Sequence, residues 1–149
     1  LVPLQAAGEE VVFRGVLLQS LGAWIKNPII PIVVPTLIFA SLHVYDVWGL
    51  AQVAVLGVLS GWLAWRTGGL EAAISLHIVN NLAVYLLLAS GITGATAQAA
   101  GAAGPLSLVI TTIGLLGYAW AAVAIFDRGS WARWSSAHGT SAPERTPAR

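Results

Sequence analysis

An all-α, polytopic transmembrane helical bundle is the fold class that this sequence predicts. Hydrophobic residues make up 57% of the 149 residues and charged residues only 9%, whereas about 25% of a typical soluble domain is charged. So few charged side chains cannot cover the apolar surface of such a chain, and lipid must therefore cover it. The apolar residues also form long stretches, and about 20 of them in a row can cross a bilayer as a helix.

Turn-forming residues divide the chain into five expected spans. The breaks fall at Lys26-Asn27-Pro28, at Trp48-Gly49, at the stretch 66–69 and at the small residues 90–105. The expected spans are approximately residues 5–25, 29–47, 50–65, 70–89 and 106–126.

The end of the chain differs in composition from these spans. Residues 127–149 are polar and rich in Pro, Ser and Arg, which predicts a disordered tail behind a membrane core of residues 1–126. The chain begins with Leu1 and contains no methionine, so we expect it to be the C-terminal part of a longer protein. Basic residues near the ends of the spans place the tail in the cytoplasm.

Composition also excludes several classes of function. The chain has no cysteine, which rules out disulfides, thiolate metal ligands and a cysteine nucleophile. Its net charge is +1 and its basic residues are scattered, so nothing indicates a nucleic-acid partner. The expected surroundings are the lipid bilayer.

Two adjacent carboxylates lie in the first span. Ionisable residues inside a span cost a few kcal/mol, so each is a candidate functional residue. Glu10 and Arg14 are four residues apart and share a helix face, where they can form an ion pair. That pairing leaves Glu9 free to act as a base. The alternative is that both glutamates lie in headgroup water at the start of the helix.

The second and fourth spans contribute histidines and an asparagine. His43 follows Phe39 by four residues, so the phenyl ring can shield the imidazole from water. His77 and Asn81 have the same spacing and can direct two donors at one point. Such donors stabilise the oxyanion that forms during acyl hydrolysis. The alternative is that these residues only form hydrogen bonds between packed helices.

Together these residues predict peptide hydrolysis within the membrane. Glu9, His43 and His77 also offer ligands for a zinc ion, and a metal-free mechanism fits the same residues. Two other functions use such a set: a non-catalytic immunity or scaffold protein, and a proton-coupled transporter.

Three motifs resemble those of the CPBP (CAAX-processing and bacteriocin-processing, or Abi) family of intramembrane proteases. Residues 9–15 resemble its Glu-Glu-x-x-x-Arg motif, residues 39–43 its Phe-x-x-x-His motif and residues 77–81 its His-x-x-x-Asn motif. Their order and separation also fit, over about residues 6–89. The resemblance implies a bundle of about eight helices in a bacterial cytoplasmic membrane, of which this chain holds the catalytic part.

The resemblance also implies roles for these residues. Glu9 would activate water with His43 beside it, His77 and Asn81 would stabilise the oxyanion, and Glu10 with Arg14 would support them. Members have been described both as metalloproteases and as metal-free glutamate proteases. The implied partner is a peptide or lipidated-peptide substrate, as in the CAAX-processing members.

The expected spans raise one conflict about depth. With a rise of 1.5 Å per residue, Glu9 and His43 lie near one bilayer face, but His77 falls about 10 Å deeper if its span starts at Leu70. Either the fourth span is displaced and tilted, or the site is a deep cavity.

Overall fold

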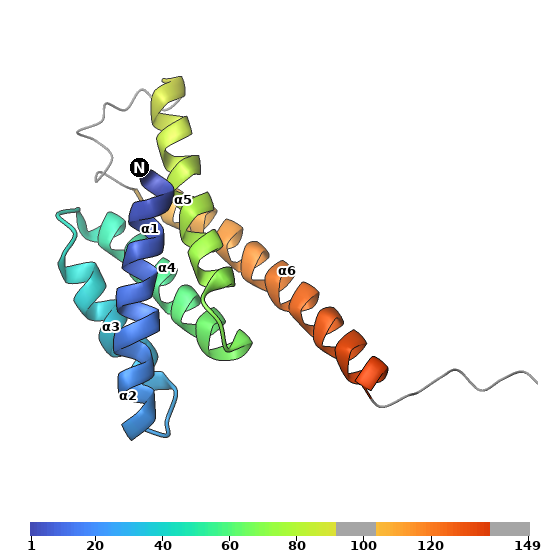
Figure 1. Ribbon diagram of the computed structural model, residues 1–149. Helices are drawn as coiled ribbons and strands as arrows, with labels where there is room; N and C mark the ends of the chain where they lie inside the picture. Colours follow the sequence, from blue (N-terminus) through green and yellow to red (C-terminus); the bar gives the residue numbers. More distant parts are fainter. Residues whose placement is uncertain (92–103, 138–149) are drawn as a thin grey trace, which may run out of the picture.

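The computed structural model describes residues 1–91 and 104–137, with side chains up to residue 129. Every secondary-structure element in these ranges is helical, and the helices form five rods (Figure 1). The chain therefore has the all-α architecture that its composition predicts.

The first rod begins at Val2 and consists of three consecutive segments. The helix α1 (Val2–Glu10) leads into a π-helical stretch (Val11–Leu17) and then into α2 (Leu18–Trp24). The backbone stays in the right-handed helical region at both junctions, so the rod is continuous. The wider π turn starts directly after the two glutamates, and π segments inside α-helices often lie at functional sites.

The helix α3 (Ile29–Ser41) is shorter than the expected span of residues 29–47. The side chain of Asn27 accepts a hydrogen bond from the backbone N–H of Ile29 and helps to start the helix. At the other end, the N–H groups of Leu42 and His43 bond to carbonyls three residues back, which tightens and closes the last turn. His43 therefore lies just beyond the helix, which corrects the expectation that it lies within a span.

Two long helices follow, with ordinary end signals. Asp46 accepts a hydrogen bond from the N–H of Gly49 at 2.7 Å and so caps α4 (Val47–Thr67). Gly68 ends α4 with φ of 71°, and Gly91 ends α5 (Glu71–Ser90) with φ of 68°. Glycine adopts this left-handed conformation with little strain, which explains both ends.

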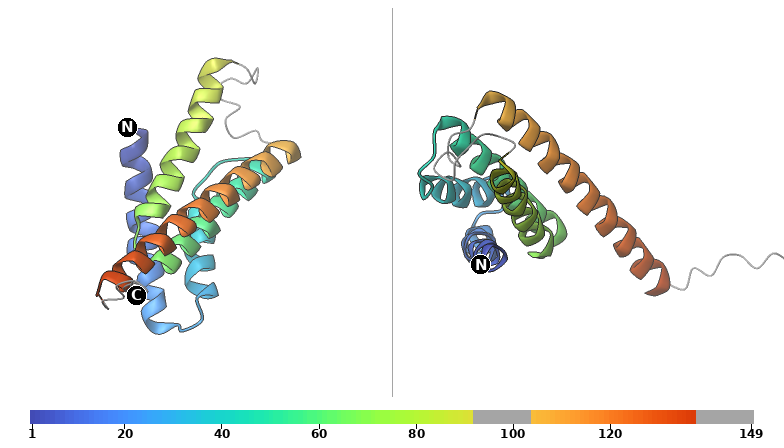
Figure 2. Two further views of the ribbon diagram at one scale, coloured as in Figure 1. Left: turned by 90° about the vertical axis from the view of Figure 1, so that its right-hand side faces the viewer. Right: turned by 90° about the horizontal axis from the view of Figure 1, so that it is seen from above.

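The last rod, α6 (Pro105–Ala137), leans across α4 and α5, and its second half extends beyond the other helices (Figure 2). The helix continues past residue 126, where the apolar span was expected to end, and past residue 127, where the polar tail was expected to begin. Asp127 is a helical residue that binds Arg66 of α4 at 2.8 Å. The rest of the expected tail, residues 138–149, lies outside the described residues.

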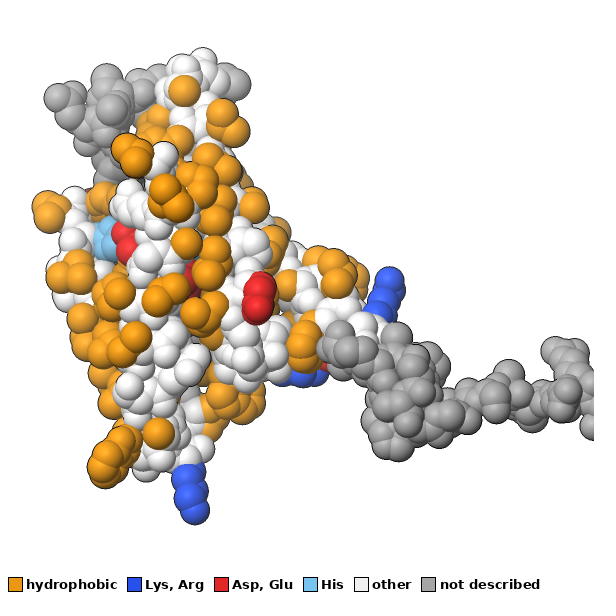
Figure 3. Space-filling view, in the orientation of Figure 1, with side chains coloured by type: hydrophobic (Ala, Val, Ile, Leu, Met, Phe, Trp, Pro, Cys, Tyr) orange, Lys and Arg blue, Asp and Glu red, His pale blue; other side chains and the backbone are white. Residues whose placement is uncertain are grey.

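Three of the described helices are long and apolar enough to cross a membrane: α4, α5 and the part of α6 from Pro105 to Gly129. The helix α3 is apolar but shorter. Large hydrophobic side chains cover much of the outer surface, as the face in Figure 3 shows. These apolar helices identify the chain as a multi-pass membrane bundle.

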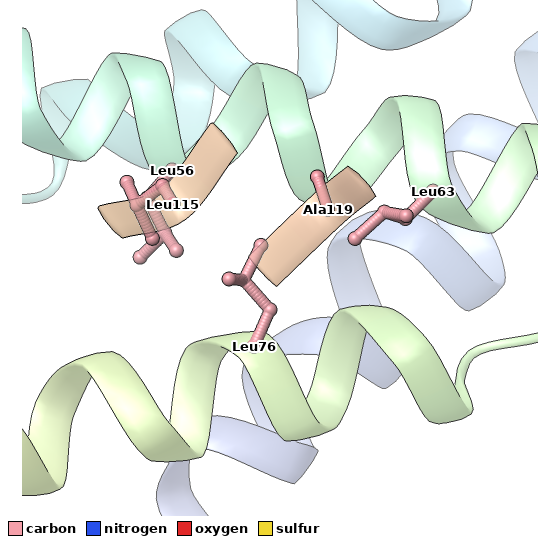
Figure 4. Packing of buried hydrophobic residues seen from close by; sticks show 5 residues of the cluster. All are labelled: Leu56, Leu63, Leu76, Leu115 and Ala119. Carbon is pink, nitrogen blue, oxygen red and sulfur yellow. The ribbon is translucent and has the colours of Figure 1, made fainter. Parts of the chain in front are cut away.

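Leucines hold α4, α5 and α6 together. Leu56 and Leu63 of α4 pack with Leu76 of α5, and with Leu115 and Ala119 of α6 (Figure 4). This cluster places α5 firmly against α4.

A second, smaller cluster lies between the first rod, α3 and α4. It contains the buried side chains of Phe13, Phe39 and Val53. The helices α1 and α5 lie side by side (Figure 1), and the buried side chains of Glu10 and His77 meet between them.

Gly57 of α4 provides the first test of this packing. A Cβ atom at this position would lie 2.7 Å from Cγ2 of Thr36 and 3.2 Å from a guanidinium nitrogen of Arg14. We expect Gly57→Ala to destabilise the protein by about 1–3 kcal/mol, because α3 and α4 must move apart. Thermal unfolding in detergent measures the effect.

Gly114 of α6 serves as the matched control. A Cβ there meets nothing within 4 Å, so Gly114→Ala is expected to be neutral or to stabilise the helix by up to about 1 kcal/mol. Equal melting temperatures for the two variants would show that α3 and α4 do not pack as described.

Candidate active site

A buried ion pair forms the base of the site. The guanidinium of Arg14 donates a hydrogen bond to Oε1 of Glu10 at 2.9 Å, and both side chains are almost fully buried. A second nitrogen of Arg14 donates to the backbone carbonyl of Gly57 at 3.1 Å. The spacing of four residues predicts this pair, and the contact with α4 adds a partner that spacing alone does not show.

The same carboxylate holds a histidine from a distant part of the chain. Nδ1 of His77 lies 2.8 Å from Oε1 of Glu10. A carboxylate only accepts hydrogen bonds, so Nδ1 is the donor, and the ring orientation of His77 is fixed. Its other nitrogen, Nε2, lies 3.6 Å from Oε2 of Glu9.

Glu9 differs from Glu10 in its surroundings. Its side chain is 26% exposed, whereas that of Glu10 is fully buried. Oε1 of Glu9 accepts a hydrogen bond from Gln5 at 3.1 Å, so Glu9 is not left without a partner as the sequence suggested. The two neighbouring carboxylates therefore have separate environments, one buried and neutralised by Arg14 and one open to a cavity.

Phe39 lies at the centre of the aromatic groups of the site. Its ring is 2% exposed and makes edge-on contacts with His43 and His77, with ring centres 4.7 and 5.7 Å apart. The guanidinium carbon of Arg14 lies 5.0 Å from the centre of the same ring. Phe39 thus shields the ion pair and lies against both imidazoles.

His43 is fixed by a backbone carbonyl. Its Nδ1 lies 2.9 Å from the carbonyl oxygen of Phe39. A carbonyl oxygen can only accept, so Nδ1 carries the hydrogen, and in the neutral ring Nε2 keeps its lone pair. His43 therefore offers a basic nitrogen although it lies beyond the end of α3.

These residues line one cavity of about 150 Å³. Glu9, His43, His77 and Asn81 all lie on its wall, whereas Glu10 and Arg14 lie behind it and do not line it. Oδ1 of Asn81 accepts a weak hydrogen bond from Asn80 at 3.3 Å, so an amide pair lies next to the two histidines. Figure 3 shows a histidine next to an acidic side chain on a surface that is otherwise largely apolar.

The proposed metal ligands do not form a compact set. Within the described residues, no three His, Asp or Glu side chains gather closely enough to hold a metal ion. Glu9 faces His77, while the ring of Phe39 packs against both His43 and His77. This arrangement therefore does not fit a zinc site built from Glu9, His43 and His77.

The depth conflict is resolved by a displacement of α5, whose C-terminal end extends beyond the start of the first rod (Figure 1). The rod begins at Val2, so Glu9 lies about 10 Å along it, and His77 lies about 9 Å along α5 from Glu71. The helices α1 and α5 run side by side in opposite directions (Figure 1). Glu9 and His77 therefore meet inside the bundle.

Several polar residues on the cavity wall do not occupy the named positions of the three motifs. Tyr45 lies in the turn between α3 and α4, and burial raises the pKa of its phenol, with further increases from the charges of Tyr85 and Glu9. The other such residues come from four helices and are Gln5, Gln52, Asn80, Tyr85 and Thr111. Two of these residues had a signal in the sequence: Gln5 precedes Glu9 by four residues, and Asn80 is an amide beside Asn81 in an otherwise apolar stretch.

Comparison with known proteins identifies one protein family that matches this chain. A family model described as type II CAAX prenyl endopeptidase Rce1-like matches residues 1–83, which include the three motifs and end before α6. The uncharacterized protein YyaK from Bacillus subtilis (strain 168) is 32% identical over 89 residues. That match covers 55% of this chain but only 30% of YyaK. No solved structure matches the chain.

The buried ion pair predicts a large effect on stability. In Arg14→Leu, the carboxylate of Glu10 stays buried without its cation, and we expect a loss of about 3–5 kcal/mol in the free energy of unfolding. The double variant Glu10→Gln/Arg14→Leu removes the charge and keeps an acceptor for His77, so it should recover most of this loss. Thermal unfolding in detergent compares the variants.

Arg66→Leu is the matched control for the loss of an arginine. Arg66 and Asp127 are 37% and 51% exposed, so this variant should change stability by no more than about 1 kcal/mol. If Arg14→Leu loses no more stability than Arg66→Leu, the ion pair does not stabilise the bundle.

Proposed function

The chain belongs to the Rce1-like family of type II CAAX prenyl endopeptidases, and we propose that it is the catalytic part of an intramembrane endopeptidase. Its substrate would be a membrane-associated or prenylated, CAAX-like peptide. The observation that carries this proposal is the separation of two adjacent glutamates, with Glu9 open to the cavity and Glu10 buried against Arg14 and His77.

In this proposal, Glu9 is the general base. Its carboxylate takes a proton from a water molecule in the cavity, and the water oxygen adds to the carbonyl carbon of the scissile peptide bond. The carbon–nitrogen bond then breaks as the leaving nitrogen takes that proton from Glu9. Nε2 of His43 accepts a hydrogen bond from the same water and orients it.

His77 and Asn81 stabilise the oxyanion of the tetrahedral intermediate. In this proposal the imidazole of His77 is doubly protonated: Nδ1 donates to Glu10, and the N–H at Nε2 is directed toward Glu9 and the cavity, where it can donate to the oxyanion. The side-chain amide of Asn81 is the second donor. Because the ion pair with Arg14 holds Glu10, these donors are in place before the substrate binds, and such preorganisation is a main source of rate enhancement.

Hydrolysis by this route uses only side chains of the chain itself. The zinc-dependent alternative requires Glu9, His43 and His77 to move together, since they form no three-ligand set here. A chelator test separates the two: in the metal-free route, cleavage persists with the chelator, whereas cleavage lost to a chelator and restored by zinc supports the other.

The role of Glu9 can be tested with an internally quenched, farnesylated CAAX peptide and the full-length protein in detergent. We expect Glu9→Gln to reduce kcat by about 100- to 10,000-fold, the range that general-base catalysis supplies. Glu71→Gln is the control, because Glu71 is exposed at the start of α5 and does not line the cavity.

Two outcomes would contradict this assignment. Cleavage by Glu9→Gln at the rate of the wild type would remove Glu9 from the mechanism. A wild-type protein that binds the peptide without cleaving it would instead indicate the non-catalytic scaffold that the sequence also allows.

His43 gives a separate prediction. An asparagine at this position can keep a donor near the carbonyl of Phe39 but lacks the second ring nitrogen. We expect His43→Asn to keep the melting temperature within a few degrees and to lose most of kcat. An equal loss of stability and activity would show that His43 has only a structural role.

A further inference from the structure

A second cavity adjoins the first. It has a volume of about 370 Å³ and is lined by Phe13, Leu42 and Val44 together with five residues that also line the first cavity. The residues common to both walls are Gln5, Glu9, Phe39, His43 and Tyr45. We call these five residues the neck.

The cavities extend from the neck in different directions. Beyond it, the first cavity is lined by α4, α5 and α6, and carries the polar side chains of Gln52, Asn81, Tyr85 and Thr111. The second is lined by the π segment and by the turn after α3, whose side chains there are apolar. A chain that occupies both cavities must therefore pass Glu9.

Tyr45 is held at the neck from both sides. Its ring centre lies 5.3 Å from that of His43, which on another side contacts Phe39. The next residue, Asp46, is fixed by its hydrogen bond to the N–H of Gly49. The turn that carries Tyr45 is thus anchored at two points, and its ring helps to position His43.

The chemistry of the walls indicates what the hydroxyl of Tyr45 can bind. Among the described residues, neither cavity is lined by Lys or Arg, and the carboxylate of Glu9 would repel a negatively charged group of a ligand. Neutral donors and acceptors such as peptide N–H and C=O groups fit these walls. Tyr45 is 41% exposed, and its raised pKa keeps the phenol protonated at neutral pH, so that it can donate to a peptide carbonyl.

We propose that the substrate runs through both cavities as an extended peptide, and that the hydroxyl of Tyr45 donates a hydrogen bond to its backbone at the neck. This inference rests on the proposed function, because it places the scissile bond beside Glu9. It assigns Tyr45 two separable tasks: its hydroxyl binds the substrate and its ring positions His43.

The test uses the full-length protein in detergent and a dansyl-labelled, farnesylated CAAX peptide as the probe. Binding is measured in the Glu9→Gln background, where the probe is not cleaved. We expect Tyr45→Phe to raise Kd about five- to tenfold, the effect of one lost neutral hydrogen bond. In the wild-type background, the same variant should raise KM by a similar factor and leave kcat within about twofold.

Tyr45→Ala removes the ring as well and should also reduce kcat by about tenfold or more, since His43 loses a packing partner. Tyr118→Phe is the matched control. Its hydroxyl bonds to Ser75 between α5 and α6, away from both cavities, so its removal should not change Kd.

Unchanged Kd in Tyr45→Phe would overturn the inference, and so would an equal increase in Tyr118→Phe. The proposed function fails in a different way. If the wild type does not cleave the probe but Tyr45→Phe still weakens binding, the neck binds peptide in a protein that is not a protease.

Discussion

The bond network of Glu10 is the constraint on which the rest of the site depends. One carboxylate oxygen accepts hydrogen bonds from Arg14 and from His77, and Arg14 also binds the carbonyl of Gly57. The first rod, α4 and α5 are thereby joined at one buried point. A buried charge without a partner is costly, so the three helices can pack closely only when these groups meet.

This constraint also explains the division of work between the two glutamates. The burial of Glu10 depends on its cation and its histidine, and in the proposed mechanism Glu10 holds His77 and does not react with the substrate. Glu9 is the next residue and points to the cavity, where a carboxylate can reach water. In the proposed mechanism, adjacent positions on one helix therefore supply a structural acid and a reactive one.

Much of the fold and part of the site could be predicted from the sequence. Composition alone gives the helical membrane class, and a spacing of four residues correctly pairs Glu10 with Arg14 and Phe39 with His43. Three features could not be predicted from the sequence: the π segment, the early end of α3 and the length of α6. Patterns of apolar residues do not show where backbone hydrogen bonds shift within a helix or at its end. Those differences move the expected limits by several residues.

Contacts between segments that are distant in the sequence also could not be predicted from residue spacing. The bond from His77 to Glu10 joins residues 67 positions apart, and its existence depends on how α5 packs on α1. Tyr45 belongs to none of the three sequence motifs. Its proposed role comes from its position in a turn that His43 and Asp46 anchor where the two cavities meet.

The placement of α6 has a consequence for the shape of the cavity. The helix lies outside the region that matches the family, yet Thr111 forms part of the cavity wall, and Gln52 and Ser75 bind α6 through Ser107 and Tyr118. Reactive groups and the far wall thus belong to different stretches of the chain. In the proposed enzyme, a substitution at Thr111 would change the shape of the cavity and leave every residue of the matched region 1–83 unaltered.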